Sequence, residues 1–400
     1  MTDNTVAQVV TEPLRALRTA LVDRQALKQQ IDEALPTITS RIDRMLFALG
    51  DKFPNEACEG GKWQPAANNQ WTNSFWTGQL WLLWEMTGNA RYREAAERHI
   101  HSFATRLVKR VETDTHDLGF LYSLSCVNAW RLTANLRARE IALHAAEMLM
   151  QRYHPTAGIV QAWGDLADPQ QQGRMIIDCN MNLPLLYWAS EQTGNPRFAR
   201  AALSHATQAA RYIVRPDAST YHTYYMDVTT GEPRYGDTHQ GHSDDSCWAR
   251  GQAWGIYGFM LSYRYSGQTD FVSLARRLSH YFINRLPEDF VCHWDLALVN
   301  TDAVRDSSAA AIAACGLLEL AKALPATDAD RLRYEEVALQ IVQSLTARYL
   351  STHHPACEGL LMHSVYHLPA GKGVDECCSW GDYFYLEALI RVRQCWTPYW

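Results

Sequence analysis

Apolar side chains recur every three to four positions over most of this chain, which is the spacing of one face of an α-helix. Helical periodicity is present in twelve segments: 27–49, 73–87, 91–110, 119–134, 137–153, 180–193, 196–213, 246–266, 270–286, 306–323, 329–349 and 380–395. Mostly apolar segments, such as Trp76–Trp84, alternate with charged amphipathic ones, such as Arg91–Glu97. A helix that is apolar all round is typically buried, and an amphipathic helix covers it. The pattern therefore predicts helical hairpins.

Similar short turns join the two helices of several hairpins. They read Thr87-Gly88-Asn89, Thr133-Ala134-Asn135, Thr193-Gly194-Asn195, Ser266-Gly267-Gln268 and Thr327-Asp328. Gly or Asn just after a helix end can take the left-handed conformation that closes the helix. Six such hairpins closed into a ring form an (α/α)6 toroid. We predict this all-α fold as a single domain over 27–400, after an N-terminal extension over 1–26. An open solenoid is the alternative, but it would show tighter repeat periods than these.

Two loops, 154–179 and 214–245, are long and rich in Gly, Pro, Tyr, Asp and His. Loops of this length in a compact domain usually build a site. Four hundred residues are enough for one large core. The 14 Trp and 19 Tyr residues suit that core and also a cleft that stacks against sugar rings.

Charge and cysteine usage exclude several partners. The net charge of −6 argues against nucleic acid, because no basic stripe offsets it. The ten cysteines are scattered without metal-ligand spacing, so we expect free thiols in a reducing compartment and neither a disulfide framework nor a zinc site. Met1–Val22 has no apolar run long enough for a signal peptide or a membrane span. The sequence predicts a cytoplasmic protein without a membrane partner, as a monomer or weak homo-oligomer.

The segment 235–255 concentrates polar and aromatic side chains at a predicted helix start. Four residues can cap that helix: Ser243, Asp244, Asp245 and Ser246. Its first turns then carry Trp248, Arg250, Gln252 and Trp254. Flat indole faces and a guanidinium fork suit a ring that carries an anion. A capped helix with tryptophans in the core is the plainer interpretation.

Aspartates stand at the starts of the predicted inner helices. They are Asp117, Asp178, Asp245 and Asp306. Inner helices of a closed ring run parallel, so these carboxylates are expected at one mouth. Helix capping is the common task of Asp at such positions. However, Asp117 and Asp178 could form a pair in which one group is ionised and the other carries a proton. Paired carboxyl groups beside a sugar are what glycoside cleavage usually requires.

Several of these motifs together resemble unsaturated glucuronyl hydrolases, glycoside hydrolase family 88. The likeness is carried by Gln240–Gly255, Thr115–Phe120, Ile176–Leu183 and Trp380–Phe384, whose order and spacing agree over roughly residues 30–395. The resemblance implies an (α/α)6 barrel that needs no metal or organic cofactor. It also implies an unsaturated oligosaccharide substrate, left by polysaccharide lyases, whose terminal Δ4,5-unsaturated glucuronate is released by hydration of its C4=C5 enol-ether bond.

The resemblance also assigns roles by matching position. Asp178 is then the general acid and base, and Asp117 is the partner that holds the substrate and tunes Asp178. The implied substrate-binding residues are His222, Gln240, Trp248, Arg250 and Trp254, with Trp71 and Trp163 as stacking walls. Lys372 matches a lysine that sulfate-preferring members use, but the serines that accompany it there are not evident here.

Three other functions remain as alternatives. The unsaturated rhamnogalacturonyl hydrolases share the fold and chemistry on pectin fragments, but the Gln-Ala that follows Arg250-Gly251 favours the glucuronyl side. A non-catalytic carbohydrate-binding toroid would lack the acids that Asp117 and Asp178 supply. A helical scaffold for protein partners would give no reason for the polar and aromatic cluster at 235–254.

Overall fold

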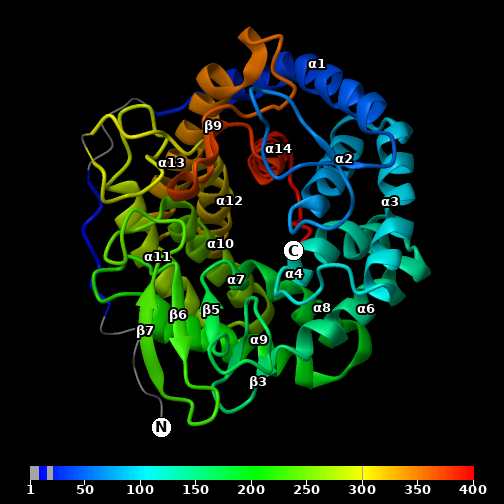
Figure 1. Cartoon of the computed structure of the whole chain (residues 1–400). Coiled ribbons are helices and arrows are strands. Elements are labelled where there is room, and N and C mark those ends of the chain that lie inside the picture. The colour runs from blue at the N-terminus through cyan, green and yellow to red at the C-terminus, as the bar shows by residue number, and fades with distance from the viewer. Residues whose placement is uncertain (1–8, 16–20, 300) are drawn as a thin grey trace.

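The inner helices of the protein form a closed ring with a second layer of helices outside it (Figure 1). This computed structural model describes residues 9–15, 21–299 and 301–400. The inner ring consists of α2 (Asn73–Thr87), α4 (Leu118–Tyr122) with α5 (Asn128–Thr133), α7 (Cys179–Asn182) with α8 (Pro184–Thr193), α10 (Ala249–Ser266), α12 (Ser307–Ala323) and α14 (Ser379–Arg393). Each inner element contacts the next, and α14 contacts α2, which closes the ring.

The outer helices cover the ring and complete the hairpins. They are α1 (Arg24–Leu49), α3 (Ala90–Val108), α6 (Leu136–Met150), α9 (Pro196–Gln208), α11 (Thr269–Ile283) and α13 (Arg331–Ser344). Most pack on the inner helix that precedes them, whereas α1 packs on α14, so the first and last helices form the sixth pair. The predicted (α/α)6 toroid is confirmed. Shorter helical turns lie at Ser123–Val127, Ala209–Ile213, Leu345–Tyr349, Ser351–His353 and Leu368–Ala370.

The turns between paired helices follow the predicted chemistry with one change. Gly88, Gly194 and Gly267 are left-handed and close their helices, as expected. Asn89, Asn135 and Asn195 do not take that conformation; each caps the next helix with its side chain. In the turn Thr133-Ala134-Asn135, Ala134 takes the left-handed conformation that glycine takes in the other turns. An asparagine side chain is a good helix cap, so these turns both end one helix and start another.

The predicted start of the helix at 246 is wrong, because α10 begins at Ala249 with no side-chain cap. Asp295 holds the preceding residues in a turn instead. Its carboxylate accepts hydrogen bonds from Ser246 Oγ at 2.6 Å and from the Cys247 backbone N–H at 3.1 Å. Trp248 therefore lies just before the helix.

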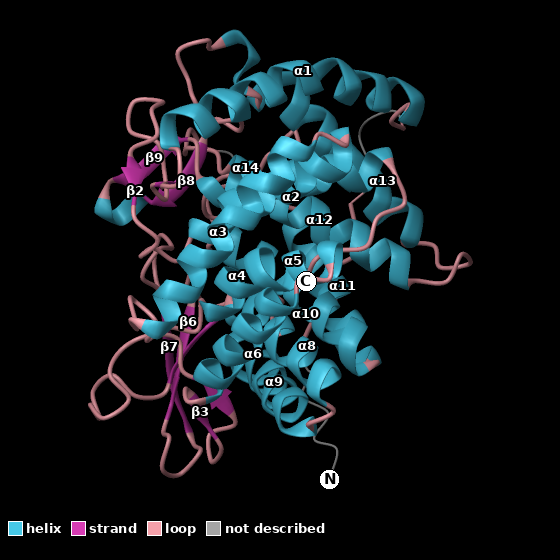
Figure 2. Ribbon diagram, turned by 90° about the vertical axis from the view of Figure 1, so that its right-hand side faces the viewer, coloured by secondary structure: helices cyan, strands magenta, loops and turns pink. Residues whose placement is uncertain are grey.

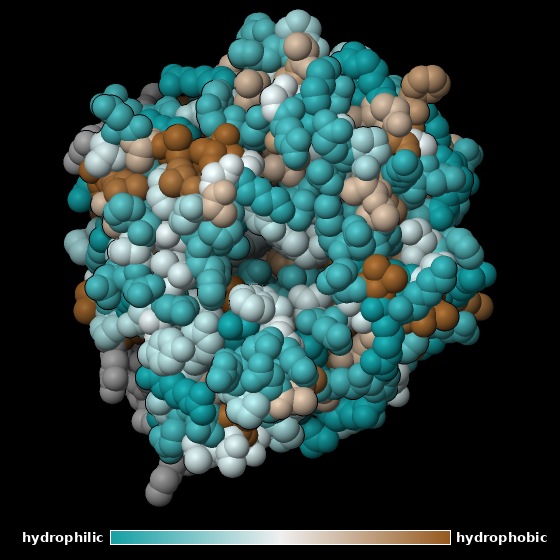
Figure 3. Space-filling model, viewed as in Figure 1, coloured by the Kyte–Doolittle hydropathy of each residue, from teal (hydrophilic) through white to brown (hydrophobic). Residues whose placement is uncertain are grey.

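Loops between the helices, including the two long ones, form small antiparallel sheets on one side of the ring, which is the left side in Figure 2. β5 (Arg174–Ile176), β6 (Thr223–Met226) and β7 (Pro233–Asp237) make one sheet, with Met175 opposite Tyr224 and Tyr224 opposite Gly236. β8 (Ser364–His367) and β9 (Lys372–Glu376) make a hairpin. The remaining short strands are β1 (Phe53–Pro54), β2 (Pro65–Ala66), β3 (Tyr153–His154) and β4 (Ile159–Val160). This face is hollowed near its centre (Figure 3).

The described part of the N-terminal extension lies against the outer helices. Glu12 pairs with Arg285 at 2.9 Å, and Arg333 donates to the Leu14 carbonyl at 3.1 Å. α1 starts at Arg24, three residues before the predicted start, and Asp23 caps it. The rest of the predicted extension, 1–8 and 16–20, lies outside the described residues. Among the residues that the structure describes, no helix has the length and apolar character needed to cross a membrane.

Candidate active site

One cavity of about 300 Å³ at the mouth of the ring brings together every site residue predicted from the sequence. These are Trp71, Asp117, Trp163, Asp178, His222, Gln240, Trp248, Arg250 and Trp254. Five further lining residues were not predicted: His116, Ile176, His239, Tyr366 and His367. The residues come from the starts of inner helices, from the β5–β6–β7 sheet region and from β8, so the fold gathers segments almost 300 residues apart.

Close packing of two inner helices places Asp117 beside Asp178. Gly119 allows this, because a Cβ at that position would lie 2.3 Å from the Asn182 Cα. The Asn182 side chain then accepts a hydrogen bond from the Phe120 backbone N–H at 2.6 Å. The starts of α4 and α7 are thereby held together, and the carboxyl groups that precede them face the same cavity.

Helix capping does not explain Asp117 or Asp178. Neither side chain forms a capping hydrogen bond with the helix that it precedes. Asp306 does cap α12, by accepting from the Ser308 and Ala309 backbone N–H groups. Asp245 is exposed and lies outside the cavity. Of the four aspartates predicted at the mouth, Asp117 and Asp178 are therefore the candidates for catalysis.

Burial makes this carboxyl pair hold a proton more strongly than isolated aspartates. Burial raises the pKa of Asp178 well above its usual range, the neighbouring Asp117 charge raises it further, and Arg250 opposes both effects. Burial also raises the pKa of Asp117 to about 6, against the opposing hydrogen bond from the Thr115 hydroxyl. Two close carboxyl groups cannot both ionise cheaply away from water. At neutral pH the pair therefore retains a proton, which we assign to Asp178.

His116 is the most informative residue that the sequence analysis missed. Its ring is buried, and its Nε2 lies 3.4 Å from the Asp117 Oδ1 and 3.4 Å from the Asp178 Oδ1. Burial lowers the pKa of His116 to about 3, so the ring is neutral. Its position directly before Asp117 was the one available signal. Within the described ranges, these three residues are the group of His, Cys, Asp and Glu whose ligand atoms lie within 4.8 Å of one another, the spacing that a metal ion would need.

Tryptophans form the walls and floor of the cavity. Trp71 stacks on Trp380, with ring centroids 5.1 Å apart, and donates from Nε1 to the Tyr366 hydroxyl at 3.1 Å. Trp163 is 40% exposed at the rim, and the Arg174 guanidinium lies 3.5 Å from its ring centre on one face. Trp254 is only 1% exposed and belongs mainly to the core. Trp71 and Trp163 are thus better placed than Trp254 to stack against a sugar.

Arg250 is held more tightly than the sequence indicated. The guanidinium is 1% exposed and donates to the Val365 carbonyl at 2.6 Å, the Tyr366 carbonyl at 2.8 Å and Gln240 Oε1 at 2.5 Å. These contacts occupy three of its five N–H donors. It also lies between the rings of Trp248 and Trp380, at 4.6 and 4.5 Å. The guanidinium is therefore not free to bind a carboxylate with a fork of two N–H groups, as the sequence suggested. Arg250 still lines the cavity and carries a positive charge there.

Gln240 and His222 each have one polar atom engaged by the protein. The Gln240 carbonyl oxygen accepts from Arg250, which leaves its amide NH₂ for a ligand. His222 Nδ1 is 2.6 Å from Thr223 Oγ1, which leaves Nε2. The His222 ring also packs on Trp248, with centroids 4.9 Å apart. Both residues can therefore contact the same ring-shaped ligand as Trp248.

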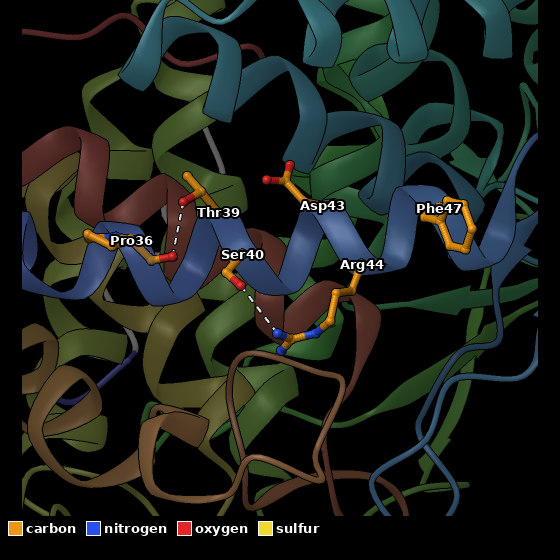
Figure 4. A pocket seen from close by; sticks show the side chains of 6 residues that line it. All are labelled: Pro36, Thr39, Ser40, Asp43, Arg44 and Phe47. Atoms are coloured by element: carbon orange, nitrogen blue, oxygen red, sulfur yellow. Dashed lines mark hydrogen bonds between the residues drawn. The ribbon is translucent and has the colours of Figure 1, made fainter.

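A second depression, on the outer surface of α1, lacks these features. Figure 4 shows its side chains along one exposed helix. They are Pro36, Thr39, Ser40, Asp43, Arg44 and Phe47. Its carboxylate, Asp43, is already paired with Arg91 and accepts from the Tyr92 hydroxyl. No pair of acids faces a ligand there, so this surface is not the candidate active site.

An (α/α)6 toroid with a partly buried carboxyl pair between tryptophan walls defines a carbohydrate-active hydrolase. The model of Glycosyl Hydrolase Family 88 matches residues 48–372, and the chain belongs to that family. An unsaturated glucuronyl hydrolase of Bacillus sp. strain GL1 is 46% identical over 93% of this chain and 98% of the relative. An unsaturated chondroitin disaccharide hydrolase of Streptococcus pyogenes is 42% identical over 98% of this chain and 97% of the relative.

Solved structures agree with these relatives. The crystal structure of unsaturated glucuronyl hydrolase from Streptococcus agalactiae superposes with a TM-score of 0.91 at 40% identity, covering 98% of this chain and 100% of the other. The corresponding enzyme from Bacillus sp. GL1, responsible for the degradation of glycosaminoglycan, gives a TM-score of 0.88 at 45% identity, covering 92% and 97%. Fold and family membership thus agree over nearly the whole chain.

Proposed function

We propose that this protein is an unsaturated glucuronyl hydrolase, which releases Δ4,5-unsaturated glucuronate from the non-reducing end of lyase-generated oligosaccharides. The observation that carries the proposal is the partly buried Asp117–Asp178 pair inside a tryptophan-walled cavity. Membership of Glycosyl Hydrolase Family 88 supports it, as do the names of the relatives.

The proposed reaction adds water across the C4=C5 bond. Protonated Asp178 gives its proton to C4, and positive charge develops at C5 and the ring oxygen. Ionised Asp117 and the new Asp178 carboxylate stabilise that charge. Water then attacks C5 and gives a proton to Asp178, which restores the acid. The resulting hemiketal opens and expels the remaining sugar, leaving a 4-deoxy-5-keto uronate.

Chondroitin-type disaccharides are the proposed preferred substrates. Three relatives from streptococci are named unsaturated chondroitin disaccharide hydrolases, and a Streptococcus agalactiae variant was crystallised with dGlcA-GalNAc6S. Lys372 is paired with Glu56 at 3.1 Å and lies 4.7 Å from the centre of the Tyr366 ring. Because this charge is already neutralised, we expect sulfated and unsulfated disaccharides to be used at comparable rates.

The test is loss of the ultraviolet absorbance of the C4=C5 bond on mixing the protein with unsaturated fragments of chondroitin, hyaluronan, heparin or gellan. Turnover of at least one, chondroitin foremost, is expected. Unsaturated rhamnogalacturonan fragments serve as the comparison for the pectin alternative. If the absorbance persists with every glucuronyl substrate, the proposal fails; if only the pectin fragment reacts, the rhamnogalacturonyl function replaces it.

Chelation is expected to leave the activity unchanged. The site residues include a possible metal-ligand set, His116, Asp117 and Asp178. A bound divalent cation would keep both carboxyl groups ionised and so remove the proton that the reaction needs. Turnover measured after dialysis against EDTA should therefore equal that of the untreated enzyme, and millimolar Zn²⁺ should inhibit. Loss of activity with EDTA and recovery with a metal would contradict the proposed chemistry.

Trp163→Ala is expected to weaken substrate binding without slowing the chemistry. The exposed indole, supported on one face by Arg174, offers its other face to a sugar. Loss of an aromatic stack of about 0.5–1.5 kcal/mol corresponds to a KM increase of about two- to tenfold. Steady-state kinetics test this, with Trp130→Ala as the control, since Trp130 lies under Arg139 outside the cavity. A fall in kcat at unchanged KM would contradict the stacking role.

We also propose a cytoplasmic location and a monomeric or weakly associating state. All ten cysteines are free, and the Cys357 and Cys377 sulfurs are 3.5 Å apart without a bond, which suits a reducing compartment. Thiol alkylation of the protein in freshly lysed native cells tests the location, and light scattering tests the assembly. Disulfides in the native cells or a stable oligomer would refute the respective proposal.

A further inference from the structure

We propose that His116 is a positioning residue that donates one neutral N–H to both carboxyl groups of the pair, and so sets how readily Asp178 releases its proton. This inference rests on the proposed function. His116 stands behind the two acids, buried to 1% exposure, at the same Nε2 distance from each. After proton transfer both acids are charged, and a donor that they share would stabilise that state.

Thr115 and Asn182 act on the Asp117 carboxyl, whereas His116 lies beside both acids. The Oδ1 atoms of Asp117 and Asp178 are buried and have no hydrogen-bond partner among the described residues, yet both face His116 Nε2 at 3.4 Å. The other oxygen of Asp117 is occupied by the Thr115 hydroxyl at 2.8 Å. Since Asp178 Oδ1 is buried, the 18% exposure of that side chain belongs to its remaining atoms. Asp178 can thus face His116 with one oxygen and the substrate with the other.

The surroundings of the ring select its tautomer. Nδ1 of His116 is buried and has no partner in the described part of the chain. A buried N–H without an acceptor is costly, whereas a proton on Nε2 has two carboxyl oxygens 3.4 Å from that nitrogen. The Nε2–H tautomer is therefore the stable one. Burial also keeps the ring uncharged, so it donates without competing for the proton that the reaction uses.

The shared N–H matters most when Asp178 has given up its proton. Both carboxylates are then charged in a buried site, and one donor directed at both lowers the free energy of that state. Other groups that act on the pair or on His116 are fixed elsewhere and remain when His116 is replaced. They are Arg106, Thr115, Arg152, Cys179, Asn182, His205, His222 and Arg250. Removing His116 alone therefore raises the pKa of the acid and weakens it.

Three substitutions separate donation from packing. The amide nitrogen of His116→Gln takes the place of Nε2, that of His116→Asn takes the place of Nδ1, and His116→Phe keeps a ring without a donor. We expect Asn and Phe to lower kcat about 10- to 100-fold, the effect of one hydrogen bond to a charged group. We also expect the alkaline limb of the pH profile of kcat/KM to move to higher pH. His116→Gln should retain most of the activity and the original limb.

Equal behaviour of the Gln and Asn variants, or a loss of kcat with an unmoved alkaline limb, would overturn the proposal. Thermal unfolding midpoints identify a variant that is merely unstable. If His116→Phe does not fold, the comparison of His116→Gln with His116→Asn still tests whether donation from the Nε2 position matters.

A readout without substrate separates this inference from the proposed function. Proton–nitrogen correlation spectra of protein labelled with ¹⁵N-histidine report which ring nitrogen of His116 carries the proton; the His116→Gln spectrum assigns the resonance. A proton on Nε2 from pH 5 to 8 is expected. A proton on Nδ1 would overturn the inference even if the wild-type enzyme turns over substrate. If no substrate reacts, the proposed function fails while the spectrum still reports on His116.

Discussion

Asp178→Asn is expected to reduce kcat on unsaturated chondroitin disaccharide about 10³-fold while the protein remains folded. The substitution keeps the size of the side chain but removes the proton that C4 must receive and the base that water needs in the second step. The buried position beside Asp117 gives the acid its raised pKa, and an amide offers no equivalent. Continuous absorbance assays measure the effect. Asp245→Asn is the matched control, because Asp245 is exposed and outside the cavity.

The same variant is expected to be more stable than the wild type at alkaline pH. The folded-state pKa of Asp178 lies above its unfolded value, so the folded state binds more protons than the unfolded state between the two. Stability then falls as the pH rises through the folded-state pKa. Asparagine does not ionise, so the unfolding temperature of Asp178→Asn should exceed that of the wild type at pH 8 by more than at pH 5. Near-normal turnover, or a gain in stability confined to acid pH, would contradict this assignment.

Arg250→Ala is expected to raise KM about 10- to 100-fold and to lower the unfolding temperature. The KM effect follows from loss of the buried charge that faces the anionic sugar. Its size is that expected for the loss of one hydrogen bond to a charged group. The loss of stability follows from the Val365 and Tyr366 carbonyls, which would lose their donors, and from the space left between Trp248 and Trp380. Steady-state kinetics and thermal unfolding measure the two effects.

Arg250→Lys separates the charge from the contacts that hold β8. Lysine keeps the positive charge but cannot reproduce the planar set of donors. Its KM should therefore lie between those of the wild type and Arg250→Ala, whereas its stability should be closer to that of Arg250→Ala. Arg234→Ala is the control, because Arg234 is an exposed arginine of β7 that pairs with Asp227. If Arg250→Ala changed stability alone, the substrate carboxylate would be bound elsewhere.

The helical ring was predictable because its signal is local and repeated. Apolar periodicity over long segments marks the inner and outer helices, and Gly88, Gly194 and Gly267 mark their ends. The sheets were not predictable, since strands of two to five residues are too short for a clear alternating pattern, and β5 pairs with β6 far away in the sequence, as Arg174 does with Tyr225. The start of α10 was misplaced for a similar reason, because Asp295 binds Ser246 from 49 residues away.

The candidate site was predictable in its membership more than in its contacts. Motif spacing identified residues that all line the cavity, including Asp117 and Asp178. It did not reveal that Arg250 is committed to the carbonyls of β8, because nothing near Arg250 in the sequence indicates that partner. His116 was missed because its one signal, the position directly before Asp117, does not indicate a role. Its meaning comes from the equal distances to two acids, which only the folded chain supplies.

The most direct test of hydration at the C4=C5 bond is the NMR spectrum of the product formed from unsaturated chondroitin disaccharide in D₂O. Hydration of the C4=C5 bond predicts that the vinyl proton signal at C4 disappears as the amino sugar is released. At early times the new C4 methylene should carry one deuterium from solvent, delivered through Asp178. Release of the amino sugar together with a uronate that keeps its C4=C5 bond would mean displacement at the anomeric carbon, and would contradict the account.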